Sequence, residues 1–147
     1  MASFSHERVG GPQGYRWTYK ANGAIPMGTL VATNTTALEV TLTGSGAQAI
    51  GVALFNEMVA KENAAETYLT TKPLEVEHLV TGQVWNLLAY ATVAVGDLCT
   101  VSATGRVLKT TATGDFVNFR ALEVVAAGSR GRFAVINGRF TTTLAGE

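Results

Sequence analysis

The feature that most constrains this chain is a succession of short apolar segments separated by turn residues. Segments rich in Thr, Val and other apolar side chains alternate with Gly, Asn or Ser, and the turns recur about every 8–12 residues, a spacing typical of β-barrels and β-sandwiches. The sequence therefore predicts a mainly β protein, a small β-barrel or β-sandwich-like domain. The expected strands span residues 15–20, 29–32, 38–42, 50–54, 74–80, 84–89, 98–101, 107–110, 118–125 and 131–136.

One segment differs from this pattern. Residues 55–68 are rich in Ala and Glu and contain no Gly or Pro, which predicts one short helix or a long loop. A chain of 147 residues has the length of one folding unit, commonly about 100–200 residues. We therefore expect an extended N-terminal arm over residues 1–20 and a single β-rich domain over residues 21–147.

A weak internal repeat is visible in the sequence. Residues 25–31 resemble residues 93–99, which lie 68 positions later, and at the same offset Ala53-Leu54 matches Ala121-Leu122. This pattern predicts two related β-units that close on one shared core. The alternative is chance similarity among strands that are rich in Gly and Val.

Charge is scarce and unevenly distributed. Charged residues make up 15% of the chain, where about 25% is usual, and the net charge of +0 argues against general attraction to nucleic acid or anionic membranes. Residues 39–77 hold six Glu against two Lys, whereas six basic and three acidic residues follow from position 106. This distribution predicts that Arg130, Arg132 and Arg139 pair with Glu57, Glu62 or Glu66 across subunits, or with acidic loops of a partner. The alternative is random scatter of surface charges.

The residues that could carry chemistry do not assemble into an active site. The single cysteine, Cys99, cannot form an internal disulfide and is expected to be a buried, inert thiol. His78 is expected to be half-buried and hydrogen-bonded in a strand, with Glu75 and Glu77 on the opposite face, which argues against a metal site. The sequence holds no nucleophile elbow, P-loop or dinucleotide-binding motif. We expect no enzyme activity, no cofactor and no metal.

The compartment follows from similar observations. No N-terminal segment resembles a signal peptide, and no apolar run approaches the roughly 20 residues that span a bilayer. With one cysteine, the chain is expected in a reducing, aqueous compartment, with no membrane partner.

The N-terminal region carries the candidate contact residues. Residues 1–14 include Gly10-Gly11-Pro12 and Gly14, and such a stretch is ordered only where something holds it. The next segment, residues 15–20, places three aromatic side chains on one strand face, and such faces are typical interface anchors. Either Trp17 plugs the chain's own barrel, or the arm reaches a partner by strand addition. The candidate contacts are Phe4, Arg8, Tyr15, Arg16, Trp17 and Tyr19.

The order of the motifs resembles that of a known family. The motifs are Gly28-x-Leu30-Val31, Ile50-Gly51-Val52-Ala53-Leu54, Val80-x-Gly82-x-Val84, Val95-Gly96-Asp97-Leu98, Thr104-Gly105-x-Val107, Arg120-Ala121-Leu122 and Gly131-x-Phe133-Ala134-Val135. Over residues 24–137 this order resembles the capsid cement, or head decoration, proteins of tailed bacteriophages. The chain departs from the pattern in its longer N-terminus and in an insertion over residues 58–68.

The resemblance implies a β-tulip type fold and a homotrimer on the outer surface of the mature head. There, near local three-fold axes, such proteins clamp subunits of the major capsid protein against DNA pressure. The resemblance provides no catalytic residues. It also implies assembly in the host cytoplasm.

Two other functions remain open, a phage tail or baseplate component and a glycan-binding adhesin domain. Exposed aromatic residues clustered in a pocket would favour the adhesin, whereas an interlocking strand edge would favour the cement protein.

Overall fold

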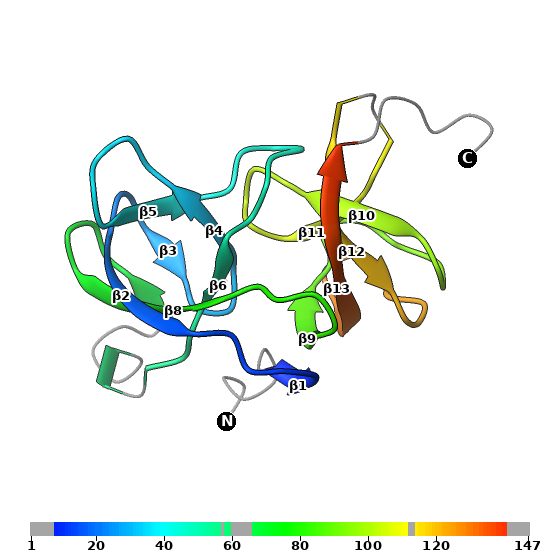
Figure 1. Ribbon diagram of the computed structural model, residues 1–147, viewed down its shortest axis with the longest axis horizontal. Coiled ribbons are helices and arrows are strands. Elements are labelled where there is room, and N and C mark those ends of the chain that lie inside the picture. The colour runs from blue at the N-terminus through cyan, green and yellow to red at the C-terminus, as the bar shows by residue number, and fades with distance from the viewer. Residues whose placement is uncertain (1–7, 57, 60–65, 112–113, 141–147) are drawn as a thin grey trace.

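The computed structural model describes residues 8–56, 58–59, 66–111 and 114–140, with the backbone alone for residues 137–140. The described residues form thirteen strands joined by turns (Figure 1). In chain order they are β1 (Arg8–Gly10), β2 (Arg16–Ala21), β3 (Ile25–Pro26), β4 (Leu30–Thr33), β5 (Glu39–Leu42), β6 (Gly51–Ala53), β7 (Thr67–Tyr68), β8 (Pro73–His78), β9 (Val84–Leu88), β10 (Leu98–Val101), β11 (Val107–Lys109), β12 (Phe116–Ala121) and β13 (Arg130–Phe140).

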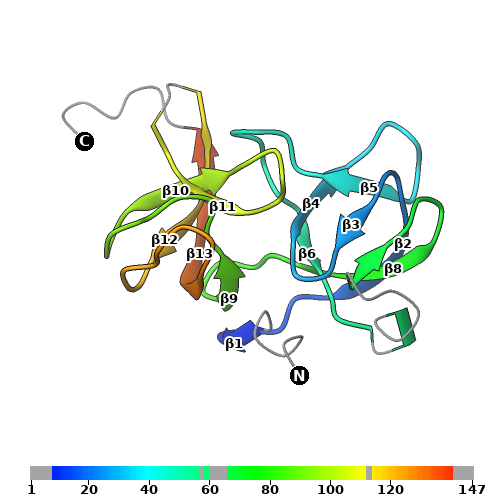
Figure 2. The same ribbon diagram turned by 180° about the vertical axis from the view of Figure 1, so that it is seen from behind.

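The strands are arranged in two units that lie side by side (Figures 1 and 2). In the first unit, strands β2, β5, β4, β6 and β8 close into a barrel. In the second, β1, β9, β13, β12, β10 and β11 form a six-stranded sheet. Each unit has its own apolar cluster, and the cluster of the second unit also includes Leu30, Ala49 and Val52 from the first. This contact joins the two cores and fixes the units against each other.

The two units repeat the same arrangement of strands. Strands β2, β4 and β5 begin at residues 16, 30 and 39. Strands β9, β10 and β11 begin 68 positions later, at residues 84, 98 and 107. Strand β6 covers residues 51–53, and the residues 68 positions later lie within β12. Strand β4 pairs with β5 and β6, as β10 pairs with β11 and β12. Strand β8 pairs with β2 and β6, as β13 pairs with β9 and β12. The predicted repeat is thus confirmed and extends over both units, whereas the expected single shared core is wrong, since each unit has its own apolar cluster.

Equivalent hydrogen bonds support this correspondence. The N–H of Gly28 donates to the carbonyl of Ala53 over 2.7 Å, and the N–H of Gly96 donates to Ala121 over 2.8 Å. Both glycines have positive φ, 82° and 85°, a conformation that favours glycine. Chance similarity does not produce the same backbone contacts at the same offset.

The connection between the last two strands of each unit differs in length. Residues 54–72 join β6 to β8, whereas only residues 122–129 join β12 to β13, so the first connection is 11 residues longer. The extra residues coincide with the insertion expected over residues 58–68. Of this connection, residues 57 and 60–65 lie outside the described part of the chain, Met58 and Val59 are helical, and Thr67–Tyr68 form β7 on β3.

The ten expected strands are all present, with bounds that shift by a few residues. The strand expected over residues 118–125 begins earlier, and the last strand, β13, continues to Phe140. Strands β1, β3 and β7 were not expected, because two or three residues cannot show an alternating pattern. The prediction of a mainly β, barrel-like fold is confirmed.

In the described part of the chain, no helix is long and apolar enough to cross a membrane.

The N-terminal arm requires a correction. Strand β1 pairs with β9 of the second unit, and β2 is a strand of the first barrel, so the described part of residues 1–20 packs on the chain's own sheets. The glycines of this segment allow the close packing: a Cβ on Gly14 would collide with the carbonyl oxygen of His78, and one on Gly11 with that of Gly82. The segment therefore crosses from the second unit to the first as part of the fold (Figures 1 and 2).

Candidate functional site

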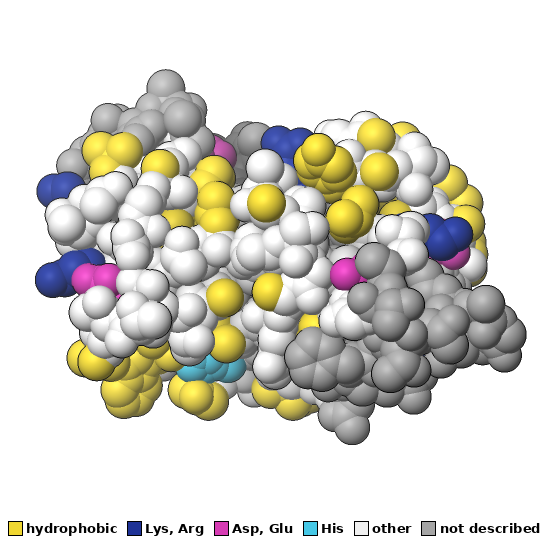
Figure 3. Space-filling model, turned by 90° about the horizontal axis from the view of Figure 1, so that it is seen from above, with side chains coloured by type: hydrophobic (Ala, Val, Ile, Leu, Met, Phe, Trp, Pro, Cys, Tyr) yellow, Lys and Arg dark blue, Asp and Glu magenta, His cyan; other side chains and the backbone are white. Residues whose placement is uncertain are grey.

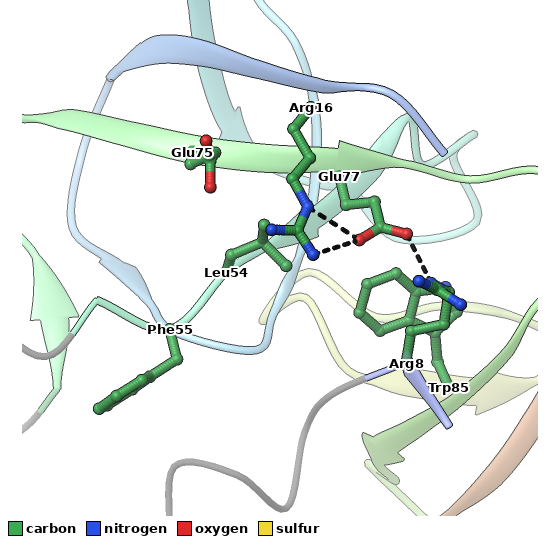
Figure 4. A pocket seen from close by; sticks show the side chains of 7 residues that line it. All are labelled: Arg8, Arg16, Leu54, Phe55, Glu75, Glu77 and Trp85. Atoms are coloured by element: carbon green, nitrogen blue, oxygen red, sulfur yellow. Dashed lines mark hydrogen bonds and ion pairs between the residues drawn. The ribbon is translucent and has the colours of Figure 1, made fainter. Parts of the chain in front are cut away.

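The start of the chain is fixed by a buried carboxylate on β8. The side chain of Glu77 is 1% exposed. Its Oε2 atom accepts hydrogen bonds from Arg8 Nε over 2.7 Å and from the N–H of Gly14 over 3.2 Å. Its Oε1 atom accepts one from Arg16 Nε over 3.3 Å (Figure 4). The carboxylate thus holds both β1 and β2, and its negative charge is balanced by two guanidinium groups.

A polar cavity of about 320 Å³ lies next to this carboxylate. Figure 4 shows Arg8 and Arg16 pointing toward Glu77, with Trp85 of the second unit beside them. Trp85 is fully buried, and its Nε1 atom donates to Gln83 Oε1 over 3.0 Å. Since the hydrogen bonds of the carboxylate are already made within the chain, the arrangement holds the two units and the N-terminal segment together.

The opposite face of β2 and β8 forms an aromatic surface made of Tyr15, Trp17, Tyr19 and His78. Tyr15 is 67% exposed and Trp17 52% exposed. The His78 ring lies between the two tyrosines, 4.0 Å from the Tyr15 ring centroid and 5.8 Å from that of Tyr19. His78 itself is buried, more fully than the expected half-buried histidine, and hydrophobic side chains gather on the molecular face drawn in Figure 3. Tyr15 and Trp17 are thus exposed at one end of this face, whereas Tyr19 packs against the core of the first unit.

His78 is held as a neutral ring. Its Nε2 atom lies 2.9 Å from the hydroxyl oxygen of Tyr19, as the expected hydrogen-bonded histidine. Burial lowers the pKa of His78, and the nearby carboxylate of Glu77 opposes this effect. The ring therefore packs between the two tyrosines, and burial favours its uncharged form over the imidazolium cation.

The repeat explains why Trp17 is unusual. At the offset of 68 residues Trp17 corresponds to Trp85. Trp17 lies opposite Val76 on β8, and Trp85 lies opposite Phe133 at the equivalent position of β13. Trp85 is 0% exposed and belongs to the core of the second unit, whereas half of the Trp17 side chain is exposed. Trp17 therefore does not plug its own barrel, whereas Trp85 fills the core of the second unit.

The other candidate residues are placed as follows. Phe4, Glu57 and Glu62 lie outside the described residues, and of Arg139 only the backbone is described, paired with Val117. Arg132 is exposed.

Glu66 and Arg130 line one cavity of about 500 Å³ within the same chain. Burial lowers the pKa of Arg130, while Glu66 raises it and Arg106 lowers it further. The structure thus brings one acidic and one basic candidate together within a single subunit.

Sequence reasoning did not identify the contact made by Glu77, which joins residues 69 positions apart. It also did not identify a difference between the two units in the exposure of one apolar side chain. Val95 is 66% exposed, whereas its equivalent Met27 is 5% exposed, because Met27 contacts the longer connection, with its N–H donating to Glu66 and its Sδ accepting from Asn56. Aligning residues 14–21 with residues 82–89, which share Gly, Trp and Ala at the same positions, could have extended the repeat.

The described residues contain no cluster of three or more His, Cys, Asp or Glu side chains that could hold a metal ion. The thiol of Cys99 is buried, as expected, and burial raises its pKa to about 12. Such a thiol is unreactive at neutral pH.

Comparison with known proteins gives a family and a fold relative. The family model for the structural cement protein (E217 gp24/Pam3 gp6) matches residues 3–147. No curated protein is significantly similar in sequence. The crystal structure of the head fiber gp8.5 N base in bacteriophage phi29 is similar with a TM-score of 0.66 and 16% identity, over 86% of this chain and 97% of that one. At this identity the likeness concerns the fold.

The family match covers essentially the whole chain, including both units and the aromatic surface. The description of this family indicates a structural protein. This chain therefore belongs to the structural cement protein family of bacteriophages and is a structural component of the phage capsid.

Proposed function

We propose that this protein binds the outer surface of the mature phage head as a homotrimer near three-fold axes. In this position it would clamp neighbouring subunits of the major capsid protein against the pressure of packaged DNA. Membership of the cement family supports the capsid as the partner. The observation that carries the proposal is the aromatic surface, whose exposed Tyr15 and Trp17 have no equivalent exposed pair on β9.

The aromatic surface has the properties of an interface anchor. A large aromatic side chain buries about 150–250 Å², and such residues dominate the affinity of protein interfaces. Arg16 is fixed to Glu77, and Tyr19 to His78. Because β2 is already rigid, little conformational entropy is lost on binding.

The proposed clamping of capsid subunits depends on several copies of the protein making the same weak contact. When three linked copies bind together, the later contacts are effectively intramolecular, which raises the overall affinity. A protein that binds the intact shell and not its dissociated subunits stabilises the shell by mass action. No covalent step and no cofactor enter this mechanism.

The test is binding of Trp17→Ala to heads that lack this protein. We expect head occupancy to fall at least about tenfold, because the variant loses the central ring of the contact. Tyr90→Ala is the matched control, since Tyr90 is also 52% exposed but follows β9 in the second unit. Co-sedimentation with heads measures occupancy, and thermal unfolding confirms that both variants are folded. Normal decoration by a folded Trp17→Ala protein would refute the proposed contact surface.

A further inference from the structure

The repeat shows that one strand edge is covered in the second unit and open in the first. Strand β1 runs antiparallel to β9, with Gly10 opposite Val84 and Arg8 opposite Trp85. At the offset of 68 residues, the equivalent positions on β2 are Arg16 and Trp17. Among the described residues, the strands paired with β2 are β8 and β5, and β5 reaches only Lys20 and Ala21.

The direction of the backbone groups follows from the hydrogen bonds of β2. The carbonyl of Tyr15 accepts from His78 N–H, and the N–H of Ala21 donates to Lys72, so the odd-numbered residues face β8. The N–H of Lys20 donates to Leu38 over 2.8 Å, on the other side of the strand. Because main-chain groups alternate along a strand, those of Thr18 and Arg16 face the side that β5 leaves uncovered.

The same alternation holds in the second unit, where the edge is occupied. The carbonyl of Gln83 accepts from Val135 N–H, and the N–H of Ala89 donates to Ser129. The odd-numbered residues of β9 therefore face β13, and Val84 faces β1. The chain thus contains its own example of an extended segment added to this edge.

We propose that the open edge of β2, at Arg16 and Thr18, accepts an extended segment of the major capsid protein as an added strand antiparallel to β2. This inference rests on the proposed function and specifies how the contact is made. Main-chain hydrogen bonds would supply the pairing, and Tyr15 and Trp17 would contact side chains of the added strand. An open strand edge is a ready template for such pairing.

The choice of the capsid protein as occupant rests on two observations. The open edge adjoins the exposed rings of Tyr15 and Trp17, so a strand placed there would be continuous with the proposed contact surface. A groove of about 380 Å³, lined by Thr18, Lys20 and Leu38 among others, runs beside the edge. Strand β1 of a second copy is not available for this role, since each copy already pairs its own β1 with β9.

The decisive variants are Thr18→Pro and Thr18→Ala. Proline removes the N–H that faces the open edge, and it is tolerated in edge strands whose N–H faces solvent. The ladder with β8 uses the odd-numbered residues and stays intact. Alanine removes the same side chain but keeps the N–H, so it is the matched control. We expect Thr18→Pro to have about tenfold lower head occupancy than Thr18→Ala.

The outcomes separate this inference from the proposed function. If Thr18→Pro binds normally while Trp17→Ala does not, the contact surface stands and strand addition is wrong. If both bind normally, the proposed contact surface fails. A changed sedimentation coefficient of the free protein with Thr18→Pro would identify a second copy as the occupant and overturn the proposal.

Hydrogen exchange of the wild-type protein decides the matter if Thr18→Pro does not fold. We expect a peptide that includes Thr18 to exchange more slowly when the protein is bound to heads than when it is free. Unchanged exchange at full occupancy would overturn strand addition.

Discussion

Glu77 is the residue on which the placement of the N-terminal segment depends. It is buried, and it accepts hydrogen bonds from Arg8, Gly14 and Arg16. Glu77→Gln keeps the shape but removes the charge, so we expect the free energy of unfolding to fall by about 1–3 kcal/mol. Glu75→Gln, on the same strand but exposed, is the control and should change it by less than about 0.5 kcal/mol. Urea unfolding measures both, and equal effects would contradict this role of Glu77.

His78 makes stability depend on pH. Burial lowers its pKa in the folded protein, whereas in the unfolded chain the pKa is about 6.5. Its contribution to stability is therefore fully present above about pH 6.5 and decreases as the pH falls from there toward the lower folded-state pKa. We expect the loss of stability between about pH 7.5 and pH 5.5 to be smaller in His78→Gln than in the wild type. An equal loss in both proteins, measured by urea unfolding, would show that another group is responsible.

Among the elements, the segment between β1 and β2 packs its glycines closely against the backbone of other segments. A Cβ on Gly14 would collide with the backbone of His78, whereas one on Gly23 would meet no atom within 4 Å. We expect Gly14→Ala to lower the free energy of unfolding by about 1–3 kcal/mol, the usual cost of overpacking. Gly44→Ala is the control, because a Cβ there meets only Ala47 at 4.0 Å and Gly44 has no positive φ. If thermal unfolding of the two variants is the same, the close packing of Gly14 is not important for stability.

The longer strands could be predicted from the sequence because each alternates over four or more residues between turn signals. The short strands β1, β3 and β7 could not, since their positions depend on pairing with β9 and on each other. In the sequence the repeat is visible over residues 25–31 and 93–99 and where Ala53-Leu54 matches Ala121-Leu122. Its extension to β2 and β9 could not be predicted because these strands share few residues. The extension to β8 and β13 could not be predicted because the longer connection before β8 changes the offset between these two strands.

The candidate site could be predicted only in part. The exposure of Tyr15 and Trp17 agrees with the aromatic strand face read from the sequence. The contacts of Arg8 and Arg16 with Glu77 could not be predicted, since they join residues more than 60 positions apart. The close packing of Gly11 and Gly14 could not be predicted either, because a Gly-rich sequence does not indicate which backbone segment it packs against.

At the scale of the whole molecule, the two units have diverged in what they expose. The second unit buries Trp85 and covers the β9 edge with β1, while the first exposes Trp17 and leaves the β2 edge open. The two units thus differ at this strand, although the second unit also exposes apolar side chains, among them Tyr90 and Val95. This asymmetry is the basis on which we assign capsid binding to the first unit.

The proposed trimer can be measured on the free protein. Exposed ion pairs contribute only about 0–1 kcal/mol each, so apolar burial must supply most of the association energy. We expect analytical ultracentrifugation to show trimers as the protein concentration rises. A monomer at every concentration would contradict self-association of the free protein and would leave the capsid lattice as the place where copies meet.

We propose that this protein stabilises the filled phage head. The test is the temperature at which DNA is released from heads with the protein at full occupancy and from heads that lack it. Since binding favours the intact shell over the disrupted one, we expect release at a higher temperature from the decorated heads. Equal release temperatures at full occupancy would contradict it.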